Sequence, residues 1–425
     1  MKDSLLRFIT CGSVDDGKST LIGRLLFDTK TILSDTLNQI EKTSKKRGLN
    51  AVDLSLLTDG LVAEREQGIT IDVAYRYFAT SNRKYIIADA PGHEQYTRNM
   101  VTAASTAQLA IILIDARKGI LTQTKRHTYI AKLLGIKQFI VAVNKMDLVD
   151  YEESIFTKIK EDYSKQFTQI FSKNNEAIDI EFIPLSALNG DMVVEKLDQM
   201  PWYKGPTLLE KLEKAQTISD TQKLDFRLPV QFVCRPRASE DENLHDFRSF
   251  MGRIESGEIK VGDKVKSLPS NKISTIKKIN IGDKDIEKAF SPQSVSIQLN
   301  DEIDISRGDI LVKELSSPSV SKNIKAIICW LSEEKLNQNR SYKIMQTTRL
   351  TKAKITKIIN KFDINNMISL ESNEIETNDI SNIELTLAQP IVGDNYSNNR
   401  KTGSFILIDD STNHTVGAGM ITEFN

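Results

Sequence analysis

The first half of the chain alternates short apolar runs with longer amphipathic segments. Continuous apolar runs of this length are typical of strands buried on both faces of a sheet. They cover Leu6–Cys11, Tyr85–Ala88, Leu109–Ile114, Phe139–Val143 and Phe182–Leu185. The periodicity between them predicts helices over Ser19–Phe27, Gln123–Leu134 and Tyr151–Phe171. Strands and helices in alternation predict an α/β domain with a doubly wound, mostly parallel sheet.

The pattern changes in the second half. A last amphipathic helix ends near Lys214, and the polar stretch Ala215–Asp225 follows it. Short alternating segments then run from Phe226 to Val312 and again from Ile324 to Phe424, with glycine-containing turns between them. Regular short strands of this kind predict two all-β barrel domains. We therefore expect three domains, over residues 1–215, 226–317 and 323–425.

A glycine-rich segment lies between the first predicted strand and the first predicted helix. It reads Gly12-Ser13-Val14-Asp15-Asp16-Gly17-Lys18-Ser19-Thr20, with the two glycines, lysine and hydroxyl spaced as in a phosphate loop. The glycines allow the backbone to curl, so that its N–H groups face phosphate at a helix N-terminus. Lys18 would then reach the β- and γ-phosphates, and Ser19 would be a ligand of Mg²⁺. The segment predicts a nucleotide site without indicating the base.

Two further motifs indicate guanine. Asn144-Lys145-Met146-Asp147 directly follows the apolar run Phe139–Val143. The Asp147 carboxylate can accept hydrogen bonds from the ring N–H and the exocyclic amine of guanine, a pair of donors that adenine lacks. Backbone N–H groups of Ser186-Ala187-Leu188, which follows the next strand, would contact the guanine carbonyl. Three motifs in this order predict GTP as the ligand.

Candidate ligands of Mg²⁺ and the γ-phosphate lie between these motifs. Asp89-Ala90-Pro91-Gly92 ends the predicted strand Lys84–Ala88, so Asp89 would hold Mg²⁺ through a water molecule and the Gly92 N–H would contact the γ-phosphate. Thr70, in the segment Glu64–Thr70, would close over Mg²⁺ in the triphosphate state. Both contacts disappear with the γ-phosphate, so the two segments are predicted to act as a switch.

His93 directly follows Gly92 and is the candidate for orienting the attacking water, a role that glutamine fills in other GTPases. The candidate catalytic residues are thus His93, Lys18 and Thr70. The other histidines, His127, His245 and His414, have no metal-like or triad-like neighbours in the sequence and are interpreted as surface or packing residues. Since no arginine is placed as a finger in cis, we expect slow intrinsic hydrolysis that a partner accelerates.

Composition adds little to this picture. The chain holds 57 basic and 57 acidic residues, so its net charge indicates no class of partner and does not exclude a nucleic acid bound at a local patch. We nevertheless expect no nucleic-acid ligand. Cys11, Cys234 and Cys329 match no metal spacing and are expected to be free thiols. No run approaches the roughly 20 apolar residues of a membrane span, and no signal peptide is apparent, so we expect a cytoplasmic protein. The polar insert Thr29–Leu57 carries the charge run Lys45-Lys46-Arg47, which is expected to be solvated surface.

With these motifs assembled, the chain resembles the translational GTPase superfamily of elongation factor Tu. The resemblance spans essentially the whole chain and implies a GTPase domain followed by two β-barrels. It is carried by Gly68-Ile69-Thr70-Ile71-Asp72, by Asp89–Tyr96 with Asn99-Met100, by Met200–Thr207 and by Gly252–Gly257.

Within that superfamily the chain is similar to the large-subunit family of heterodimeric sulfate adenylyltransferases. Translation factors usually carry histidine where Ser13 stands, and histidine or serine where Asp16 stands. Asp59-Gly60-Leu61 and Thr402–Asp409 point to the same family. Its members tend to have His-Gly-Thr-Arg where this chain reads Gln346-Thr347-Thr348-Arg349, a departure that leaves the nucleotide site untouched and could alter a partner contact.

The resemblance implies a function. In this family GTP hydrolysis drives the uphill reaction of ATP and sulfate to adenosine 5′-phosphosulfate and pyrophosphate, as a step of sulfate assimilation. It implies GTP and Mg²⁺ as ligands of this chain and a small catalytic subunit as its partner, in a heterodimer or a higher assembly. The sequence has no second phosphate loop and no histidine cluster suited to adenylyl transfer, so that site is expected on the partner.

Two other functions compete with this one. A translation elongation factor would bind aminoacyl-tRNA with GTP and would have no effect on sulfate chemistry, and Ser13 and Asp16 count against it. A phosphate-loop kinase for a small metabolite would have no use for Asn144–Asp147 or for Thr70.

Overall fold

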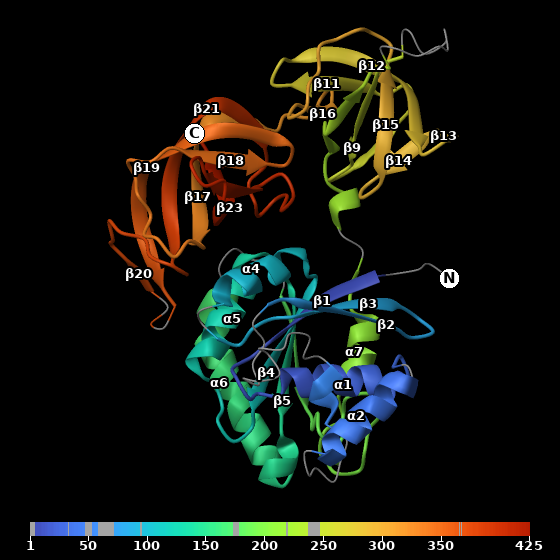
Figure 1. Cartoon of the computed structure of the whole chain (residues 1–425), viewed down its shortest axis with the longest axis vertical. Coiled ribbons are helices and arrows are strands. Elements are labelled where there is room, and N and C mark those ends of the chain that lie inside the picture. Colours follow the sequence, from blue (N-terminus) through green and yellow to red (C-terminus); the bar gives the residue numbers. More distant parts are fainter. Residues whose placement is uncertain are drawn as a thin grey trace. The chain divides into compact units, whose positions relative to one another are not determined.

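The computed structural model describes residues 5–32, 34–46, 53–57, 72–93, 96–172, 178–217, 220–236, 247–364, 366 and 368–425. The chain forms two compact units (Figure 1). The first comprises Met1–Thr217 with the short segment Ile364–Asn366, and the second comprises Ile218–Asp363 and Met367–Asn425.

A six-stranded sheet in the order β2-β3-β1-β4-β5-β6 forms the centre of the first unit. Its strands are β1 Leu5–Cys11, β2 Ala74–Ala79, β3 Lys84–Asp89, β4 Leu109–Asp115, β5 Gln138–Asn144 and β6 Asp179–Pro184. Every neighbouring pair is parallel except β2 with β3. The central strand β4 is buried along its whole length, as expected when helices cover both faces. The predicted doubly wound, mostly parallel sheet is confirmed.

Helices cover both faces of this sheet, with α4, α5 and α6 on one side and α1 and α7 on the other (Figure 1). They are α1 Lys18–Asp28, α2 Ser34–Lys46, α4 Thr97–Thr106, α5 Thr122–Leu133, α6 Glu153–Ser172 and α7 Leu208–Lys214, with short 3₁₀ turns η1 Leu54–Leu57 and η3 Met146–Val149. Among the described residues, no helix combines the length and the apolar character that a membrane span requires.

Several elements, among them the unpredicted helix α4, differ from the sequence-based prediction. β2 is not predicted, because it is an edge strand in which exposed Tyr75 and Tyr77 alternate with more buried residues. The insert Thr29–Leu57 contains the helix α2 and the turn η1. The predicted helix Tyr151–Phe171 begins too early, since Asp150 and Tyr151 have positive φ angles of 51° and 54° and α6 starts at Glu153.

The second unit consists of antiparallel sheets. After the turn η4 Asp220–Gln222, the first set is β7 Arg227–Pro229, β8 Phe232–Cys234, β9 Ser249–Arg253, β10 Glu258–Lys260, β11 Lys264–Leu268, β12 Lys272–Ile281, β13 Lys284–Ile286, β14 Lys288–Phe290, β15 Ser294–Leu299 and β16 Ile310–Lys313. The main sheet runs β7-β16-β11-β12-β15-β9-β8. A bridge between Arg227 and Ser256 brings β7 next to the end of β9, which curls the sheet into a barrel.

A second barrel follows. Its strands are β17 Ser319–Trp330, β18 Tyr342–Gln346, β19 Arg349–Asp363, β20 Ile368–Leu370, β21 Ile380–Gly393, β22 Ser404–Asp409 and β23 Thr415–Phe424. The order is β18-β22-β23-β17-β21-β19-β20, and an additional pairing of β18 with β19 closes the ring. The predicted class, a P-loop α/β domain followed by two all-β barrels, is confirmed.

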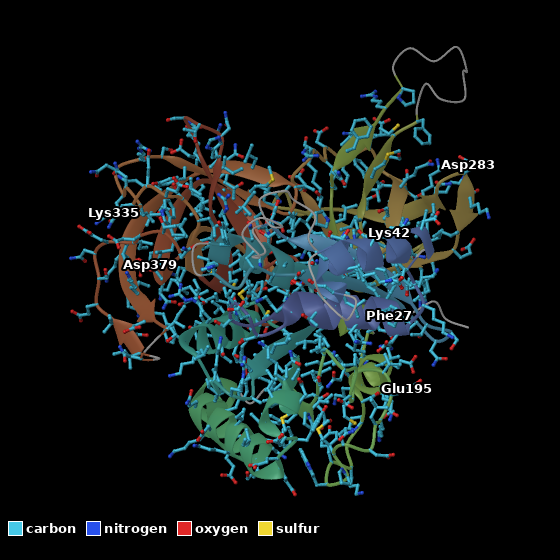
Figure 2. All side chains as sticks on the ribbon, turned by 60° about the horizontal axis from the view of Figure 1, so that its bottom comes forward. Phe27, Lys42, Glu195, Asp283, Lys335 and Asp379 are labelled. Carbon is cyan, nitrogen blue, oxygen red and sulfur yellow. The ribbon has the colours of Figure 1, made fainter. Side chains whose placement is uncertain are left out.

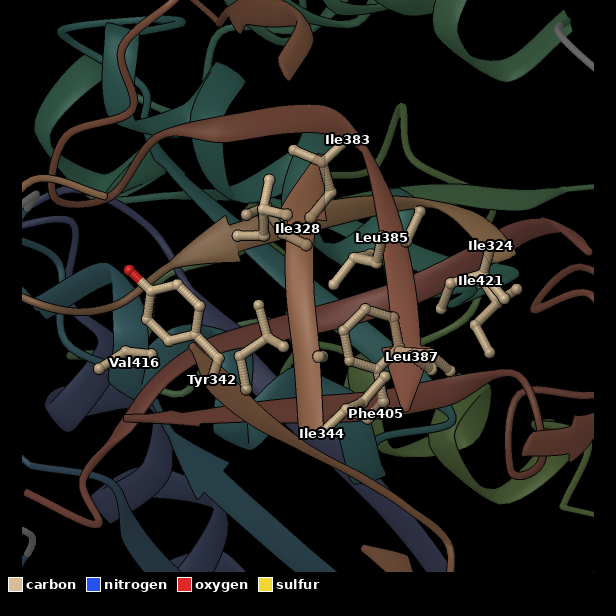
Figure 3. Packing of buried hydrophobic residues seen from close by; sticks show 14 of the residues in the cluster. Ile324, Ile328, Tyr342, Ile344, Ile383, Leu385, Leu387, Phe405, Val416 and Ile421 are labelled. Carbon is tan, nitrogen blue, oxygen red and sulfur yellow. The ribbon is translucent and has the colours of Figure 1, made fainter. Parts of the chain in front are cut away.

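Each barrel has its own hydrophobic core. The first is formed by residues between Phe226 and Leu311, and the second by residues between Ile324 and Ile421. In the second, Tyr342, Phe405 and the aliphatic side chains around them point into the barrel (Figure 3). The domain limits 226–317 and 323–425 remain a proposal, which these two separate cores support. The limit at residue 215 also remains a proposal, and it is supported by the boundary between the two units after Thr217.

The segment that departs from the family pattern lies in the second barrel. Gln346 is fully buried, and its side-chain amide donates to the backbone carbonyls of Val392 (3.0 Å) and Thr402 (2.6 Å). Thr347 begins the two-residue turn between β18 and β19 with φ 51°, a left-handed conformation that glycine adopts more easily. The Gln346 side chain therefore forms hydrogen bonds inside the barrel.

A buried ion pair joins the two barrels. The Arg227 guanidinium, whose side chain is 4% exposed, makes two hydrogen bonds to the Asp394 carboxylate, from Nε at 3.0 Å and Nη2 at 2.9 Å. Its Nη1 donates to Phe226 O and Ser316 Oγ, and Thr402 Oγ1 donates to Asp394. Removing one partner would leave a buried charge without compensation.

Replacing Asp394 by asparagine is expected to destabilise the second unit by about 3 kcal/mol. Urea unfolding of a Trp202→Phe background would measure it, because Trp330 is then the only tryptophan and reports on this unit. Lys335→Ala is the control. Lys335 pairs with Glu374 and Glu376 on the exposed surface (Figure 2), and its loss should change the stability of the second unit very little. Equal effects of the two substitutions would contradict this account.

Candidate nucleotide site

The predicted motifs meet at one edge of the sheet. β1 leads into the phosphate loop, β3 into Ala90–His93, β5 into Lys145–Asp147 and β6 into Ser186–Leu188. These four strands are parallel, so their carboxyl ends lie along the same edge, where open α/β sheets bind ligands.

Asn144 links two of these motifs by its side chain. It is 2% exposed, its Nδ2 donates to the carbonyl of Asp16 at 2.7 Å, and its Oδ1 accepts from the Ala187 N–H at 2.9 Å. Gly17 has φ 92° and packs on Asn144, since a Cβ there would overlap Asn144 Nδ2. Glycine is thus required at position 17 by both conformation and space.

Lys18, the first residue of α1, lies inside the phosphate loop. Its Nζ donates to the carbonyls of Gly12 (3.0 Å) and Ser13 (2.8 Å). Burial lowers the pKa of this ammonium below its ordinary value, and the Asp89 carboxylate opposes that shift only in part. No ion pair of Lys18 is found within the described residues. A buried cation with carbonyl partners is suited to an anionic ligand.

Gly92 lies directly against this loop. A Cβ at Gly92 would lie 2.8 Å from Lys18 Nζ and 3.0 Å from Gly12 O and Val14 N. Any larger residue at this position would require Lys18 and the loop backbone to shift. Ala90 and Pro91 before it are buried, and Asp89 is 1% exposed, with Thr10 Oγ1 3.2 Å from its Oδ1.

The rest of the phosphate loop lies nearer the surface. Val14, Ser19 and Thr20 are half-buried, and Asp15 is exposed. Asp16 is the exception, at 1% exposure, and its Oδ2 accepts from the Ser13 N–H at 2.6 Å. Burial raises the pKa of the Asp16 carboxyl above its ordinary value, although the Ser13 N–H favours the charged form.

The structure does not test the catalytic roles predicted for His93 and Thr70. His93 is exposed, and its ring stands edge-on to Tyr96 with 6.5 Å between centroids. Thr70 lies outside the described residues, as does the whole segment Glu64–Thr70. Their predicted roles therefore stay predictions.

Lys145 and Asp147 lie at the end of the site where the sequence predicts the base. Lys145 Nζ lies 3.1 Å from Asp115 Oδ2 and also donates to the carbonyl of Asp15 in the phosphate loop. Asp147 Oδ1 is buried and has no hydrogen-bond partner among the described residues. Met146 is fully buried and anchors the motif through its N–H to Leu185 O at 3.3 Å. An unpaired buried carboxylate oxygen is expected where a ligand donates.

The Ser186–Leu188 segment already uses two of its N–H groups. Ser186 N–H donates to the carbonyl of Asp191 at 3.2 Å, and Ala187 N–H donates to Asn144. Leu188 is 58% exposed. A guanine carbonyl would therefore share the Ala187 N–H with Asn144 or take the N–H of Leu188.

Sequence reasoning missed two residues that hold this end of the site. Arg24 of α1 donates from Nε to Ala187 O at 3.2 Å and from Nη2 to Leu188 O, which fixes the base segment to the phosphate-loop helix. No motif marks Arg24. Asp115 ends β4, and the rule that ligands bind at carboxyl ends of parallel strands could have found it.

Asp115 is fully buried between two cations. Arg117 binds it from Nε at 3.0 Å and Nη2 at 2.6 Å, and Lys145 adds its ammonium. Burial by itself would raise the pKa of Asp115, but the hydrogen bonds from Arg117 and Lys145 outweigh it and hold this pKa well below its usual range. The carboxylate is thus charged at neutral pH and positions Lys145.

His127, interpreted from the sequence as a surface or packing residue, lies inside the domain and has a partner in the phosphate loop. It is 3% exposed, and its Nδ1 accepts from the Gly12 N–H of the phosphate loop at 3.2 Å. Burial, with Lys18 and Arg126 nearby, lowers its pKa to about 3. His414 is exposed, as interpreted, and His245 lies outside the described residues.

Comparison with known proteins agrees with this geometry. Residues 3–217 match the elongation factor Tu GTP binding domain, and residues 323–422 match the GTP-eEF1A C-terminal domain-like family. The protein named sulfate adenylyltransferase subunit 1 of Aliarcobacter butzleri is 55% identical over 98% of this chain and 87% of its own length. Proteins of the same name from Psychromonas ingrahamii and Aeromonas salmonicida are 53% and 52% identical, over 98% and 99% of this chain and 87% of their own lengths.

The chain belongs to the sulfate adenylyltransferase subunit 1 family. Its first domain is a GTP-binding domain of the elongation factor Tu type. The described phosphate-loop and guanine motifs all lie within the matched range 3–217.

The stability of the first unit should fall below pH 6.5 because of His127. An unfolded histidine has a pKa of about 6.5, whereas the folded value is about 3. Between these values the unfolded chain binds a proton that the folded chain does not, so stability is lost as pH falls, by up to about 1.4 kcal/mol per pH unit.

Urea unfolding between pH 7 and pH 5, followed by Trp202 fluorescence in a Trp330→Phe background, would measure this slope. His127→Asn removes the titrating ring and should flatten the slope. An identical pH dependence in the two proteins would contradict the expected role of His127.

Proposed function

We propose that this chain is the GTPase subunit of a sulfate adenylyltransferase. In this proposal GTP hydrolysis drives ATP and sulfate to adenosine 5′-phosphosulfate and pyrophosphate, and adenylyl transfer takes place on a small catalytic partner subunit. The observation that carries the nucleotide part is the pair of hydrogen bonds by which Asn144 joins the phosphate loop to Ala187, next to the unpaired oxygen of Asp147. Membership in the sulfate adenylyltransferase subunit 1 family supports the rest.

In the proposed complex the phosphate loop binds the GTP phosphates. N–H groups of the loop between Gly12 and Thr20 would face the phosphates, except those of Gly12 and Ser13, which stay bonded to His127 and Asp16. The Lys18 ammonium would exchange its carbonyl partners for phosphate oxygens. The close packing of Gly92 on Lys18 supports a direct contact of the Gly92 N–H with the γ-phosphate. Loss of that phosphate would release Gly92 and the residues around it.

Guanine is selected by Asp147. Its carboxylate would accept both N–H donors of the base, while an adenine nucleotide would leave a buried charge unpaired. Lys145, held between Asp115 and the carbonyl of Asp15, would lie along the base and link it to the phosphate loop.

Mg²⁺ fits the chemistry of this site. The ion prefers oxygen ligands and commonly keeps waters while it binds nucleotide phosphates through few protein groups. Ser19 would be a direct ligand, Asp89 would act through a water, and Thr70 would close over the ion in the triphosphate state. When bound, the ion would neutralise charge that develops on the phosphates.

Hydrolysis would be slow in the isolated chain. His93 would orient the attacking water, for which its exposed ring must turn from Tyr96 toward the γ-phosphate. A binding partner that favours that turn would accelerate the reaction. We propose the small catalytic subunit, in a cytoplasmic complex, as this partner.

A mixture experiment tests the function. GTP turnover and pyrophosphate release would be followed together for the chain alone and with the small subunit, ATP and sulfate. Coupled function requires both rates to rise only in the complete mixture. If GTP turnover is unchanged by sulfate and the small subunit but rises with ribosomes, the chain is a translation factor. That result would overturn the sulfate assignment.

Asp147→Asn is expected to weaken GTP binding by roughly 10²-fold and to favour xanthine nucleotides, because an amide can donate to the xanthine carbonyl. Competition of GTP and XTP against a fluorescent guanine nucleotide would measure the change. The nearby exposed carboxylate offers a control, and Asp150→Asn should leave both affinities unchanged. Unchanged GTP affinity in Asp147→Asn would refute the assignment of the base.

His93→Ala is expected to slow GTP hydrolysis in the complete mixture by roughly 10²-fold, since a water-positioning group is lost, while GTP affinity stays within about twofold. Single-turnover hydrolysis and equilibrium binding would separate the two. His414→Ala, at another exposed histidine, should change neither. Collapse of GTP binding in His93→Ala would indicate a structural residue instead.

A further inference from the structure

His127 connects helix α5 to the first residue of the phosphate loop. Its Nδ1 lies 3.2 Å from the backbone N of Gly12, although the two residues are 115 positions apart in the sequence. A backbone N–H can only donate, so Nδ1 must be the unprotonated nitrogen of the ring. The imidazole is therefore neutral, with its proton on Nε2.

Gly12 lies where three parts of the nucleotide site meet. Its N–H is held by His127, and its carbonyl accepts from Lys18 Nζ at 3.0 Å. The same carbonyl would lie 3.0 Å from a Cβ at Gly92, so the switch glycine packs on it as well. A shift of Gly12 would move both groups that are proposed to meet the γ-phosphate.

The N–H of Gly12 needs an acceptor from outside the sheet. β1 ends at Cys11, which is aligned with Ile112 of β4, and Gly12 is the first residue beyond this ladder. Gly12 itself is buried. Buried backbone N–H groups almost always have an acceptor, because leaving one unpaired is costly. His127 provides that acceptor.

We propose that His127 is a positioning residue of the nucleotide site, whose neutral imidazole fixes Gly12 and thereby places Lys18 and Gly92 for the terminal phosphate. It acts through the loop and contacts no nucleotide atom. This inference rests on the proposed guanine-nucleotide function and adds a residue to it.

The surroundings of the ring keep it in the accepting form. His127 is buried, and the charged groups that act on it are the cations Lys18 and Arg126. Both favour the neutral ring. The bond to Gly12 is therefore maintained across the physiological pH range.

Two substitutions separate the acceptor from the bulk of the side chain. His127→Leu keeps an apolar side chain of similar size and removes the acceptor, so GTP and GDP affinity should fall by roughly tenfold. His127→Asn places an amide oxygen near the position of Nδ1, and its affinity should stay within about threefold of the unmodified chain. Titration of the full chain with fluorescent GDP and with a non-hydrolysable GTP analogue would measure both.

Thr128→Val is the matched control. Thr128 is the next residue of α5, and its hydroxyl bonds to Thr124 O and Tyr163 inside the domain, away from the loop. Thr128→Val should lower thermal stability without changing nucleotide affinity. If His127 were purely structural, its variants would show this same pattern. Thermal unfolding of every variant would be recorded beside the binding data.

The outcomes are distinct from failure of the proposed function. If the unmodified chain bound no guanine nucleotide, the proposed function itself would be wrong. If it bound and His127→Leu bound equally well, or if Leu and Asn lost affinity equally, the positioning role would be overturned. Should His127→Leu not fold, His127→Asn still decides, because a loss well above threefold in a folded Asn variant contradicts the acceptor role.

Discussion

The hydrogen bonds of one buried amide, that of Asn144, determine the shape of the nucleotide site. The side chain reaches the phosphate loop with its nitrogen and the base segment with its oxygen. In the proposed complex this one amide would fix the distance between the segment that binds the phosphates and the segment that binds the base. Gly17 packs on this amide, and Arg24 makes a second connection between the same two segments. A displacement of either segment would therefore move the other one as well.

The charged groups around the site differ in how completely their hydrogen bonds are satisfied where they are buried. Lys18 is buried with carbonyl partners, and Asp147 keeps one buried oxygen without a partner. Both groups are costly to hold in the absence of a ligand, because their hydration is lost without full compensation. Asp115 is also buried, but hydrogen bonds from Arg117 and Lys145 compensate its charge and keep the carboxylate ionised. In the proposed complex the incompletely satisfied groups, Lys18 and Asp147, would bind the ligand, whereas the satisfied Asp115 positions Lys145.

The two barrels of the second unit have separate main cores and are joined by an ion pair and a small apolar cluster. Arg227 and Asp394 form a desolvated pair, and a small apolar cluster of Leu268, Ile310, Val312 and Val392 lies at the same junction. An ion pair with several hydrogen bonds has a defined geometry, whereas apolar contacts alone permit sliding. The arrangement favours one fixed orientation of the barrels within this unit.

The sequence by itself determined the fold class and the motifs of the site. Alternating strands and helices predicted the sheet, and each motif at a strand end could be placed because parallel strands end at one edge. The same reasoning missed β2, whose exposed Tyr75 and Tyr77 follow the pattern of an edge strand. Only the tertiary structure revealed His127 and Arg24. Each bonds to a segment more than a hundred positions away, and no local pattern records which distant backbone group a buried side chain will meet.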